Sequence, residues 1–256
     1  METADLFSRW EYRVAGGMTD AFGFCRVSDT LRFMQESAAE QLERYGPDAQ
    51  TLREQGRAFF LSRISMDLPV PLFRGTRVFA ETYPGATSRG FSFDRCYRLF
   101  SEGDVPAACA FSQWAMLDVR KKTLIRLEDS GYTYSRDDPV TVSIPLRFRI
   151  PRDAEMISCG EKTVRYADID ANGHMNNTHY PDLVCDFLPE LAEFHPEEPV
   201  RVTAFAAAFL HEAPLGEVLR VSRTAAPDGT GLYYFRTVRA SDGEVNMEAA
   251  VRVEKV

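Results

Sequence analysis

The pattern of hydrophobic and polar positions along the chain predicts the same series of elements twice. In the first half, residues 10–14 are strand-like, and residues 28–42 have the period of an amphipathic helix. Its apolar positions are Leu31, Met34, Ala38 and Leu42. Ser28 is the expected N-cap of this helix, and Gly46-Pro47 is its expected end. Further strand-like segments, separated by turns rich in Gly, Pro and Asp, lie at residues 58–68, 76–83, 90–100 and 105–118.

The second half repeats this order with little identity of residues. A strand is predicted at residues 162–166 and a helix at residues 177–188. The strands predicted after it are residues 201–211, 217–224, 231–240 and 244–254. A strand, a long helix and a run of antiparallel strands in each half predict an α+β fold, with two curved sheets that each wrap around a central helix.

The stretch between the halves is rich in Pro and Asp and has little periodicity. We therefore expect an N-terminal domain at residues 1–130, a linker at residues 131–157 and a C-terminal domain at residues 158–256. Pairing two such units covers sheet edges that a single unit leaves exposed, so the chain should form an internal pseudo-dimer. A monomer is then sufficient, although a homodimer stays open.

Composition and charge exclude several classes of protein. The chain has 256 residues, of which 45% are hydrophobic, so it can form a substantial core. Its apolar stretches are far shorter than the roughly 20 residues of a membrane span. The net charge of −8 disfavours nucleic acid as a partner. Charged residues near the N-terminus interrupt any signal peptide, and we expect a cytoplasmic protein.

Motifs for metals and cofactors are missing from the sequence. The five cysteines are an odd number and form no C-x-x-C pair, which disfavours both a disulfide framework and a zinc site. The phosphate-loop, dinucleotide-binding and serine-elbow motifs do not occur. We therefore expect neither a metal nor a cofactor.

One polar segment has the residue types that acyl transfer needs. Asp170, Asn172 and His174 alternate with small or apolar residues, so an extended backbone would place them on one side. Asn177 is the expected N-cap of the helix that follows, whose first N–H groups would point at this trio. A carboxylate or imidazole moves protons, and N–H groups and an amide stabilise an oxyanion. A polar turn before a capped helix is the alternative interpretation.

The segment also resembles a known family. The string D-I-D-A-N-G-H-M-N-N at residues 168–177, with Tyr180 after it, is similar to the active-site segment of the acyl-acyl-carrier-protein (acyl-ACP) thioesterases. Residues 33–46 resemble the first helix of that family, and residues 112–118 resemble its W-x-x-x-D strand. These enzymes of plant plastids and bacteria consist of two tandem hotdog domains.

The resemblance implies an activity and a set of residues. It implies hydrolysis of fatty acyl-ACP thioesters to free fatty acid and carrier protein, with the acyl tail in the first domain. Asp170, Asn172 and His174 take the catalytic D-x-N-x-H positions, and Glu212 takes the place of a further acid. Ala213 occupies the position where the family has a cysteine. Water is therefore the expected nucleophile, or a carboxylate attacks directly, and the general base among Asp170, His174 and Glu212 stays open.

Two further expectations concern surfaces. Docking of an acidic carrier protein requires a local basic face, and the candidates are Arg120–Lys122 with Arg126, or Arg147, Arg149 and Arg152. Alternation along residues 201–211 places Ala204, Ala206 and Ala208 on the Glu212 face of a strand, where they would let the central helix lie close to the sheet.

Two alternative functions stay open from the sequence. One is an acyl-CoA thioesterase of the same fold. The other is a non-catalytic acyl-thioester-binding protein, which the missing cysteine at Ala213 would favour.

Overall fold

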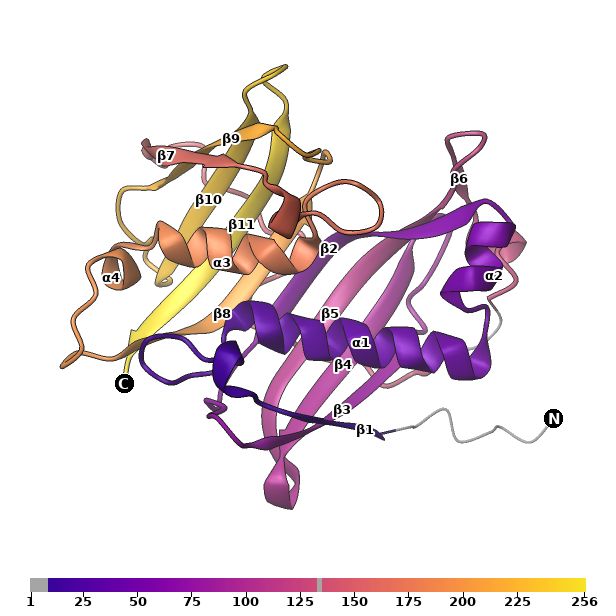
Figure 1. Cartoon of the computed structure of the whole chain (residues 1–256), viewed down its shortest axis with the longest axis horizontal. Helices are drawn as coiled ribbons and strands as arrows, with labels where there is room; N and C mark the ends of the chain where they lie inside the picture. Colours follow the sequence, from indigo (N-terminus) through magenta and orange to yellow (C-terminus); the bar gives the residue numbers. More distant parts are fainter. Residues whose placement is uncertain (1–8, 133–134) are drawn as a thin grey trace.

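Strands from both halves of the chain join into one antiparallel sheet of eleven strands, with the helices on one of its faces (Figure 1). The computed structural model describes residues 9–132 and 135–256. In the first half the elements are β1 (Arg9–Arg13), α1 (Val27–Tyr45), α2 (Ala49–Glu54), β2 (Arg57–Asp67), β3 (Arg77–Pro84), β4 (Phe93–Ser101), β5 (Val105–Asp118) and β6 (Thr123–Ile125). In the second half they are β7 (Met156–Thr163), α3 (Tyr180–Asp186), α4 (Pro189–Ala192), β8 (Val200–Phe209), β9 (Val218–Thr224), β10 (Leu232–Arg239) and β11 (Val245–Lys255).

The strand order places the junction of the two halves in the middle of the sheet. The order is β1-β3-β4-β5-β2-β8-β11-β10-β9-β7, with β6 paired to β5. The halves therefore meet at the antiparallel pair β2-β8, whose register runs from Arg63 opposite Ala208 to Asp67 opposite Ala204. Both central helices lie across the same side of this sheet, close to each other (Figure 1).

Helix α1 lies across the first half of the sheet and buries one apolar stripe. Leu31 and Met34 are fully buried, as the helical spacing predicted. The helix ends at Gly46, which has a φ of +63° and donates its N–H to the carbonyl of Leu42. The predicted N-cap was wrong, because the cap is Arg26 and Ser28 lies buried inside the first turn.

The central helix of the second half is much shorter. It begins with a 3-10 turn at Asn177–His179 and ends at Asp186. The ring of Phe187 then packs against Gly160, where a Cβ would lie only 3.0 Å from it. Gly160 is also the place where the register of β7 with β9 shifts. The strand predicted at residues 162–166 was therefore wrong in position, since β7 ends at Thr163 and a glycine bulge obscures its period.

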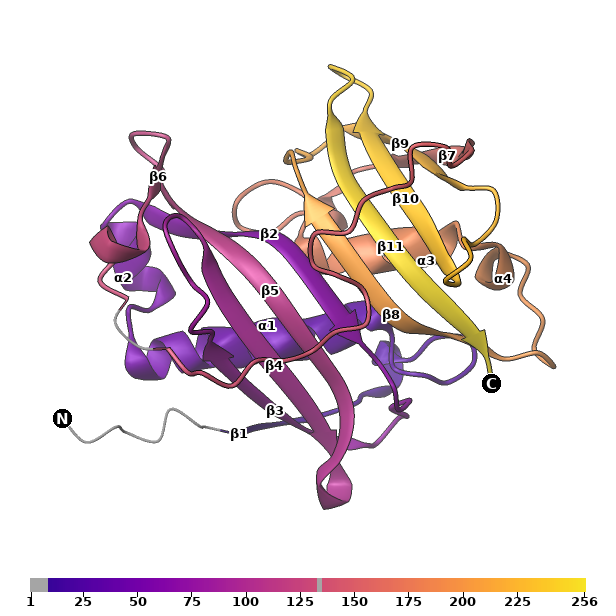
Figure 2. The same ribbon diagram turned by 180° about the vertical axis from the view of Figure 1, so that it is seen from behind.

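The two faces of β8 are the reverse of those predicted. Phe205 and Ala207 pack in the core with the helices, whereas Ala204 and Ala206 face the opposite side of the sheet. The connecting segment covers that side (Figure 2). Its Ile144 is fully buried against these alanines, and the Ile144 carbonyl accepts a hydrogen bond from Ser65 on β2 at 2.6 Å. The small side chains make room for the connection instead of the helix.

These features confirm the predicted α+β fold with two hotdog units, each a curved antiparallel sheet around a central helix. The boundaries at residues 130 and 157 stay a prediction. Within residues 9–132 and 135–256, no helix is both long and apolar enough to cross a membrane. Residues 1–8, on which the expected location partly rests, lie outside the described residues.

The burial of Ile144 leads to a test of whether the connection is part of the core. Ile144→Ala should lower the free energy of unfolding by about 2–5 kcal/mol, because it leaves a cavity between the connection and β8. Chemical denaturation followed by circular dichroism measures this change. Thr141→Ala, at an exposed position of the same segment, is the control and should change stability by no more than about 0.5 kcal/mol. Equal effects of the two variants would contradict the packing described.

Candidate active site

The polar segment singled out from the sequence forms a tight turn and not an extended strand. The N–H of Gly173 donates to the Asp170 carbonyl at 3.0 Å, and the N–H of Asp170 donates to the His174 carbonyl at 3.2 Å. Asp170 Oδ1 also accepts the N–H of Asn172 at 2.8 Å. Gly173 has a φ of +84°, which a residue with a Cβ rarely adopts. The turn, rather than alternation, brings Asp170, Asn172 and His174 to one place.

These residues and Glu212 line a common cavity of about 340 Å³. Nε2 of His174 lies 3.4 Å from Oε1 of Glu212. The His174 side chain is 19% exposed and that of Glu212 is 60% exposed, so the imidazole lies inside the cavity and the carboxylate at its mouth. All four predicted residues are therefore close together, and their roles in catalysis stay a prediction.

The opposite wall of the cavity comes from the first half of the chain. Gln35 on α1, residues 59–62 on β2 and Trp114 on β5 line it. Nε2 of Gln35 is buried and has no hydrogen-bond acceptor in the described part of the chain. An amide donor that is buried without an acceptor is an expensive feature for a folded protein. Sequence reasoning missed Gln35, whose only signal was its place in the stretch that resembles the family's first helix.

A buried hydrogen-bond network fixes the backbone around Glu212. Asn246 on β11 is 1% exposed; its side-chain amide donates to the His211 carbonyl and to the Tyr180 hydroxyl, and its Oδ1 accepts from Thr237. Arg239 Nη1 donates to the Glu212 carbonyl at 2.9 Å. Burial raises the pKa of Tyr180 to about 12, so its hydroxyl stays neutral within this network. The position of Glu212 thus depends on buried groups behind it.

The start of the second central helix supplies a further donor. Asn176, and not the predicted Asn177, is the N-cap: its Oδ1 accepts the N–H and the hydroxyl of Thr178, each at 2.9 Å. The backbone N–H of Asn177 has no acceptor within the described residues, and Asn177 lines the cavity. Asn177 can therefore donate its backbone N–H to a ligand.

A second, apolar cavity of about 420 Å³ adjoins the first. The two share Gln35, Phe59 and Trp114, which lie at their junction. Phe59, Phe93 and Tyr132 meet edge to face around the second cavity, with ring centroids 5.3–6.1 Å apart. Helix α1 covers it with Ala38, Ala39 and Leu42. The polar site therefore opens into an apolar space inside the first half.

The turn of the polar segment occurs a second time, in the first half of the chain. Asp20 corresponds to Asp170: its Oδ1 accepts the N–H of Phe22 at 2.9 Å, and its own N–H donates to the Phe24 carbonyl at 2.8 Å. Each turn is followed by the same strand contact, from Cys25 N to Leu72 O and from Met175 N to Ala213 O. The two loops are thus related by the internal repeat.

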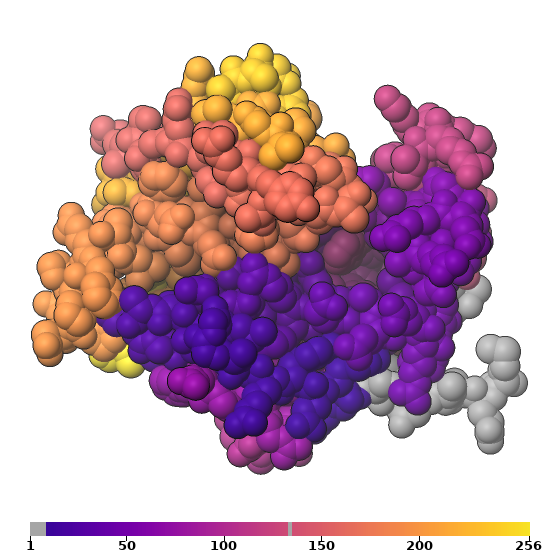
Figure 3. Space-filling model, in the orientation of Figure 1, coloured from indigo at the N-terminus to yellow at the C-terminus, as the bar shows by residue number. Residues whose placement is uncertain are grey.

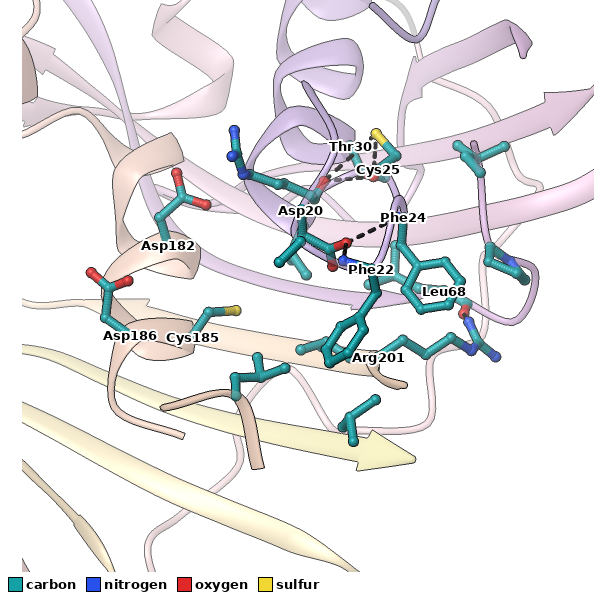
Figure 4. A pocket seen from close by; sticks show the side chains of 18 of the residues that line it. Asp20, Phe22, Phe24, Cys25, Thr30, Leu68, Asp182, Cys185, Asp186 and Arg201 are labelled. Atoms are coloured by element: carbon teal, nitrogen blue, oxygen red, sulfur yellow. Dashed lines mark hydrogen bonds between the residues drawn. The ribbon is translucent and has the colours of Figure 1, made fainter. Parts of the chain in front are cut away.

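The side chains of this first loop are not those of the second. Phe22 and Phe24 stand where Asn172 and His174 stand, and Pro71 stands where Glu212 stands. They line a cavity of about 540 Å³ with Asp182, Cys185 and Asp186 of the second half on the facing side (Figure 4). Burial raises the pKa of Asp20. The repeat therefore provides two equivalent cavities, and of these only the one around His174 has the acid, amide and imidazole together.

The cysteine thiols lie outside this cavity. None of the five cysteines lines the cavity around His174. Burial raises the pKa of the thiol of Cys185, and that of Cys25 to about 11, so both are protonated at neutral pH. Among the described residues, no group of three His, Cys, Asp or Glu side chains is arranged to hold a metal ion.

The fold and the position of the cavity between the halves define the class of this protein, a tandem hotdog protein. Residues 153–255 match the family model of the acyl-ACP thioesterase C-terminal domain. Similarity to this family, indicated by the sequence, is thereby confirmed for residues 153–255.

Solved structures of low sequence identity share the whole fold. An acyl-ACP thioesterase from Bacteroides thetaiotaomicron matches with a TM-score of 0.81 at 20% identity, over 99% of this chain and 100% of that one. A 12:0-ACP thioesterase from Umbellularia californica matches with a TM-score of 0.75 at 16% identity, over 98% of both chains. No curated protein sequence matches the chain.

The network behind Glu212 can be tested through stability. Asn246→Ala should lower the free energy of unfolding by at least about 2 kcal/mol, because it leaves the Tyr180 hydroxyl and the His211 carbonyl buried without their partner. The measurement is a denaturant titration. Asn172→Ala, at an exposed position of the same site, should change it by no more than about 0.5 kcal/mol. A neutral Asn246→Ala would show that this network does not hold the loop.

Proposed function

We propose that the protein hydrolyses fatty acyl-ACP thioesters, releasing free fatty acid and carrier protein. The observation that carries the proposal is the His174–Glu212 pair, 3.4 Å apart, in a cavity that opens into an apolar space. The family match of residues 153–255 supports thioester hydrolysis as the class of reaction. The Bacteroides and Umbellularia proteins of similar fold are acyl-ACP thioesterases, which supports the same substrate class here.

In the proposed reaction, water attacks the thioester carbonyl carbon. Glu212, whose carboxylate lies at the mouth of the cavity beside His174, takes a proton from the water as its oxygen bonds to the carbonyl carbon. Glu212 passes this proton to Nε2 of His174, which lies 3.4 Å away. Collapse of the tetrahedral intermediate then breaks the carbon–sulfur bond, and His174 gives the proton to the departing thiolate. Asp170 Oδ1 accepts the N–H of Asn172, so Asp170 fixes the turn that carries His174.

Two donors beside His174 would stabilise the oxyanion. They are the side-chain amide of Asn172 and the backbone N–H of Asn177. One such donor contributes about 10²–10³ in rate. The wall that faces these donors comes from the first half, so the cavity needs both halves. With Ala213 at the family's cysteine position and no thiol in the cavity, water is the nucleophile of choice.

The adjoining cavity is the proposed site of the acyl tail. Its volume of about 420 Å³ lies within the range of small-molecule sites, and it begins at the residues that face His174. In this placement the first half of the chain binds the acyl tail, and the second half carries the acid–base groups.

The basic hairpin around β6 is the proposed contact for carrier protein. Figure 3 shows a hollow between the loop that contains residues 165–175 and the α2 and β6 region. Arg120, Lys121, Lys122 and Arg126 are exposed there, and Arg126 precedes Leu127, which lines the acyl cavity. Arg149 and Arg152 belong instead to the connecting segment on the opposite side of the sheet (Figure 2). Of the two basic groups, the hairpin is the one beside the hollow.

Release of free thiol from acyl-ACP substrates of several chain lengths tests the proposed reaction. Glu212→Gln and His174→Ala should each lower kcat by about 10²–10⁴, because they remove the acid–base pair. Glu193→Gln, at an exposed position in the second half, is the matched control and should keep the wild-type rate. Turnover on acyl-CoA alone would assign a different thioester, and binding without turnover of any thioester would favour an acyl-binding protein.

Electrostatic docking predicts a difference between two substrates with the same acyl group. Replacing Arg120, Lys121, Lys122 and Arg126 by Ala should raise KM for acyl-ACP about 10-fold at low salt, because an acidic carrier loses its long-range attraction. KM for the acyl-CoA ester should change much less. The double variant Arg149→Ala and Arg152→Ala is the control on the other side of the sheet. Equal changes for both substrates would reject docking on the hairpin.

A further inference from the structure

A buried cation lines the acyl cavity at a distance from the reaction site. Arg95 on β4 is 6% exposed and lines the cavity together with Phe93 and Tyr132. Strand β4 lies two strands away from β2, which carries Phe59 at the junction with the site. At about 4.8 Å per strand, Arg95 is about 10 Å across the sheet from Phe59, whereas Trp114, also at the junction, lies on the adjacent strand β5.

The partners of Arg95 are all uncharged. Its Nη1 donates to Oε1 of Gln41 at 2.6 Å and to the Thr82 hydroxyl at 3.0 Å, and its Nη2 donates to the Tyr132 hydroxyl at 3.2 Å. Among the described residues, no carboxylate lies within ion-pair distance of this guanidinium. The neighbouring Asp94 instead accepts hydrogen bonds from Thr87, Ser92 and Gln113.

Two N–H groups of Arg95 have no hydrogen-bond acceptor among the described residues. A guanidinium has five N–H groups. The three hydrogen bonds above use three of them, so Nε–H and one N–H of Nη2 have no acceptor in the described part of the chain. Burial of a cation without a counter-charge is costly, and proteins rarely retain one without a ligand or a partner.

The surroundings decide what such a ligand would be. The aromatic rings of Phe59, Phe93 and Tyr132 make the middle of the cavity suitable for methylene groups. A chain that ends in a methyl group would displace water from the free N–H groups of Arg95 and leave these donors buried without an acceptor, which is unfavourable. An oxygen acceptor at the end of the chain would instead receive these donors.

We infer that the cavity selects acyl chains that carry an oxygen acceptor, a hydroxyl or a carboxylate, near the end remote from the thioester, and that Arg95 is the residue that recognises it. This inference rests on the proposed function for the identity of the thioester end. It concerns the remote end, which can be examined separately. Arg95 is here a specificity-determining residue, since it lies away from the reacting atoms.

A substrate series tests the inference. Matched thioesters from hexanoyl to dodecanoyl, each with a methyl, an ω-hydroxyl or an ω-carboxylate end, are assayed with the wild-type protein and with Arg95→Met. At the best-fitting chain length the wild type should prefer one of the oxygen-bearing chains by about 10-fold or more in kcat/KM, as a hydrogen bond from a charged donor provides. Arg95→Met should reverse this preference in favour of the methyl-ended chain. The comparison of the hydroxyl and carboxylate arms identifies which oxygen is preferred.

Controls separate the inference from folding and from the proposed function. Arg220→Met makes the same chemical change at an exposed position of β9 and should leave the preference unaltered. Calorimetric titration of the wild type with free ω-hydroxy acids and with plain fatty acids needs neither turnover nor a variant, and it should show tighter binding of the oxygen-bearing acid. Equal or better use of methyl-ended chains, in the assay and in the titration, would overturn the inference. If no thioester is hydrolysed but the titration shows the preference, the proposed function fails and the inference stands.

Discussion

The antiparallel pairing of β2 with β8 is the constraint on which the rest of the structure depends. Beyond one end of this ladder, β2 continues into residues 59–62, which line the polar cavity, and β8 leads to the loop that contains Glu212. The ladder thereby sets the distance between the half that carries Gln35 and the half that carries His174. A slip of one residue would exchange the faces of the strand and remove the core side chains Phe205 and Ala207 from the helices. Core packing and the site therefore require the same register.

Repetition of one loop with different side chains explains why only one of the two equivalent cavities combines an acid, an amide and an imidazole. Both copies keep the aspartate whose carboxylate accepts a backbone N–H two residues later, at Asp20 and at Asp170. That hydrogen bond serves the turn, so it is needed in both copies. The imidazole, the amide and the second carboxylate serve no such purpose, and the first copy has Phe22, Phe24 and Pro71 in their places. Conformation is thus common to the two halves, while reactive groups are confined to one.

Periodicity was a good guide to most of the fold because most elements bury one face. The strands that form the middle of the sheet and helix α1 lie close to their predicted positions. Errors arose where local geometry interrupts the period. Gly160 puts a bulge into the edge strand β7. The N-cap positions at Arg26 and Asn176 depend on the backbone conformation of the loop that precedes each helix. Strand β8 ends at Phe209, so Leu210 and His211 lie outside it, before Glu212. Extending the two-residue alternation of the strand back from Glu212 therefore assigned the alanines of β8 to the wrong face.

The candidate site was predictable only where its residues are close in sequence. Asp170, Asn172 and His174 share one turn, so their proximity follows from the sequence even though the reason given for it, alternation, was wrong. Glu212 was found through resemblance to a family, not through spacing. Gln35 and Arg95 could not be found from sequence, since their significance lies in hydrogen bonds that are missing in the interior. Unsatisfied donors become visible only once the packing around them is known.

Helix α1 also fixes a distance along the cavity that it covers in the first half. Gln35, at the reaction site, and Gln41, which holds Arg95, lie on the same rigid helix, and at 1.5 Å per residue they are about 9 Å apart along its axis. The helix thus fixes the spacing between the cavity around His174, which Gln35 lines, and the buried guanidinium that Gln41 binds. In relatives of this chain, inserting or deleting one helical turn between the positions of Gln35 and Gln41 would move the contact with the guanidinium by about 5.4 Å. The preferred length of the bound chain and the preferred chemistry of its end group would then change together.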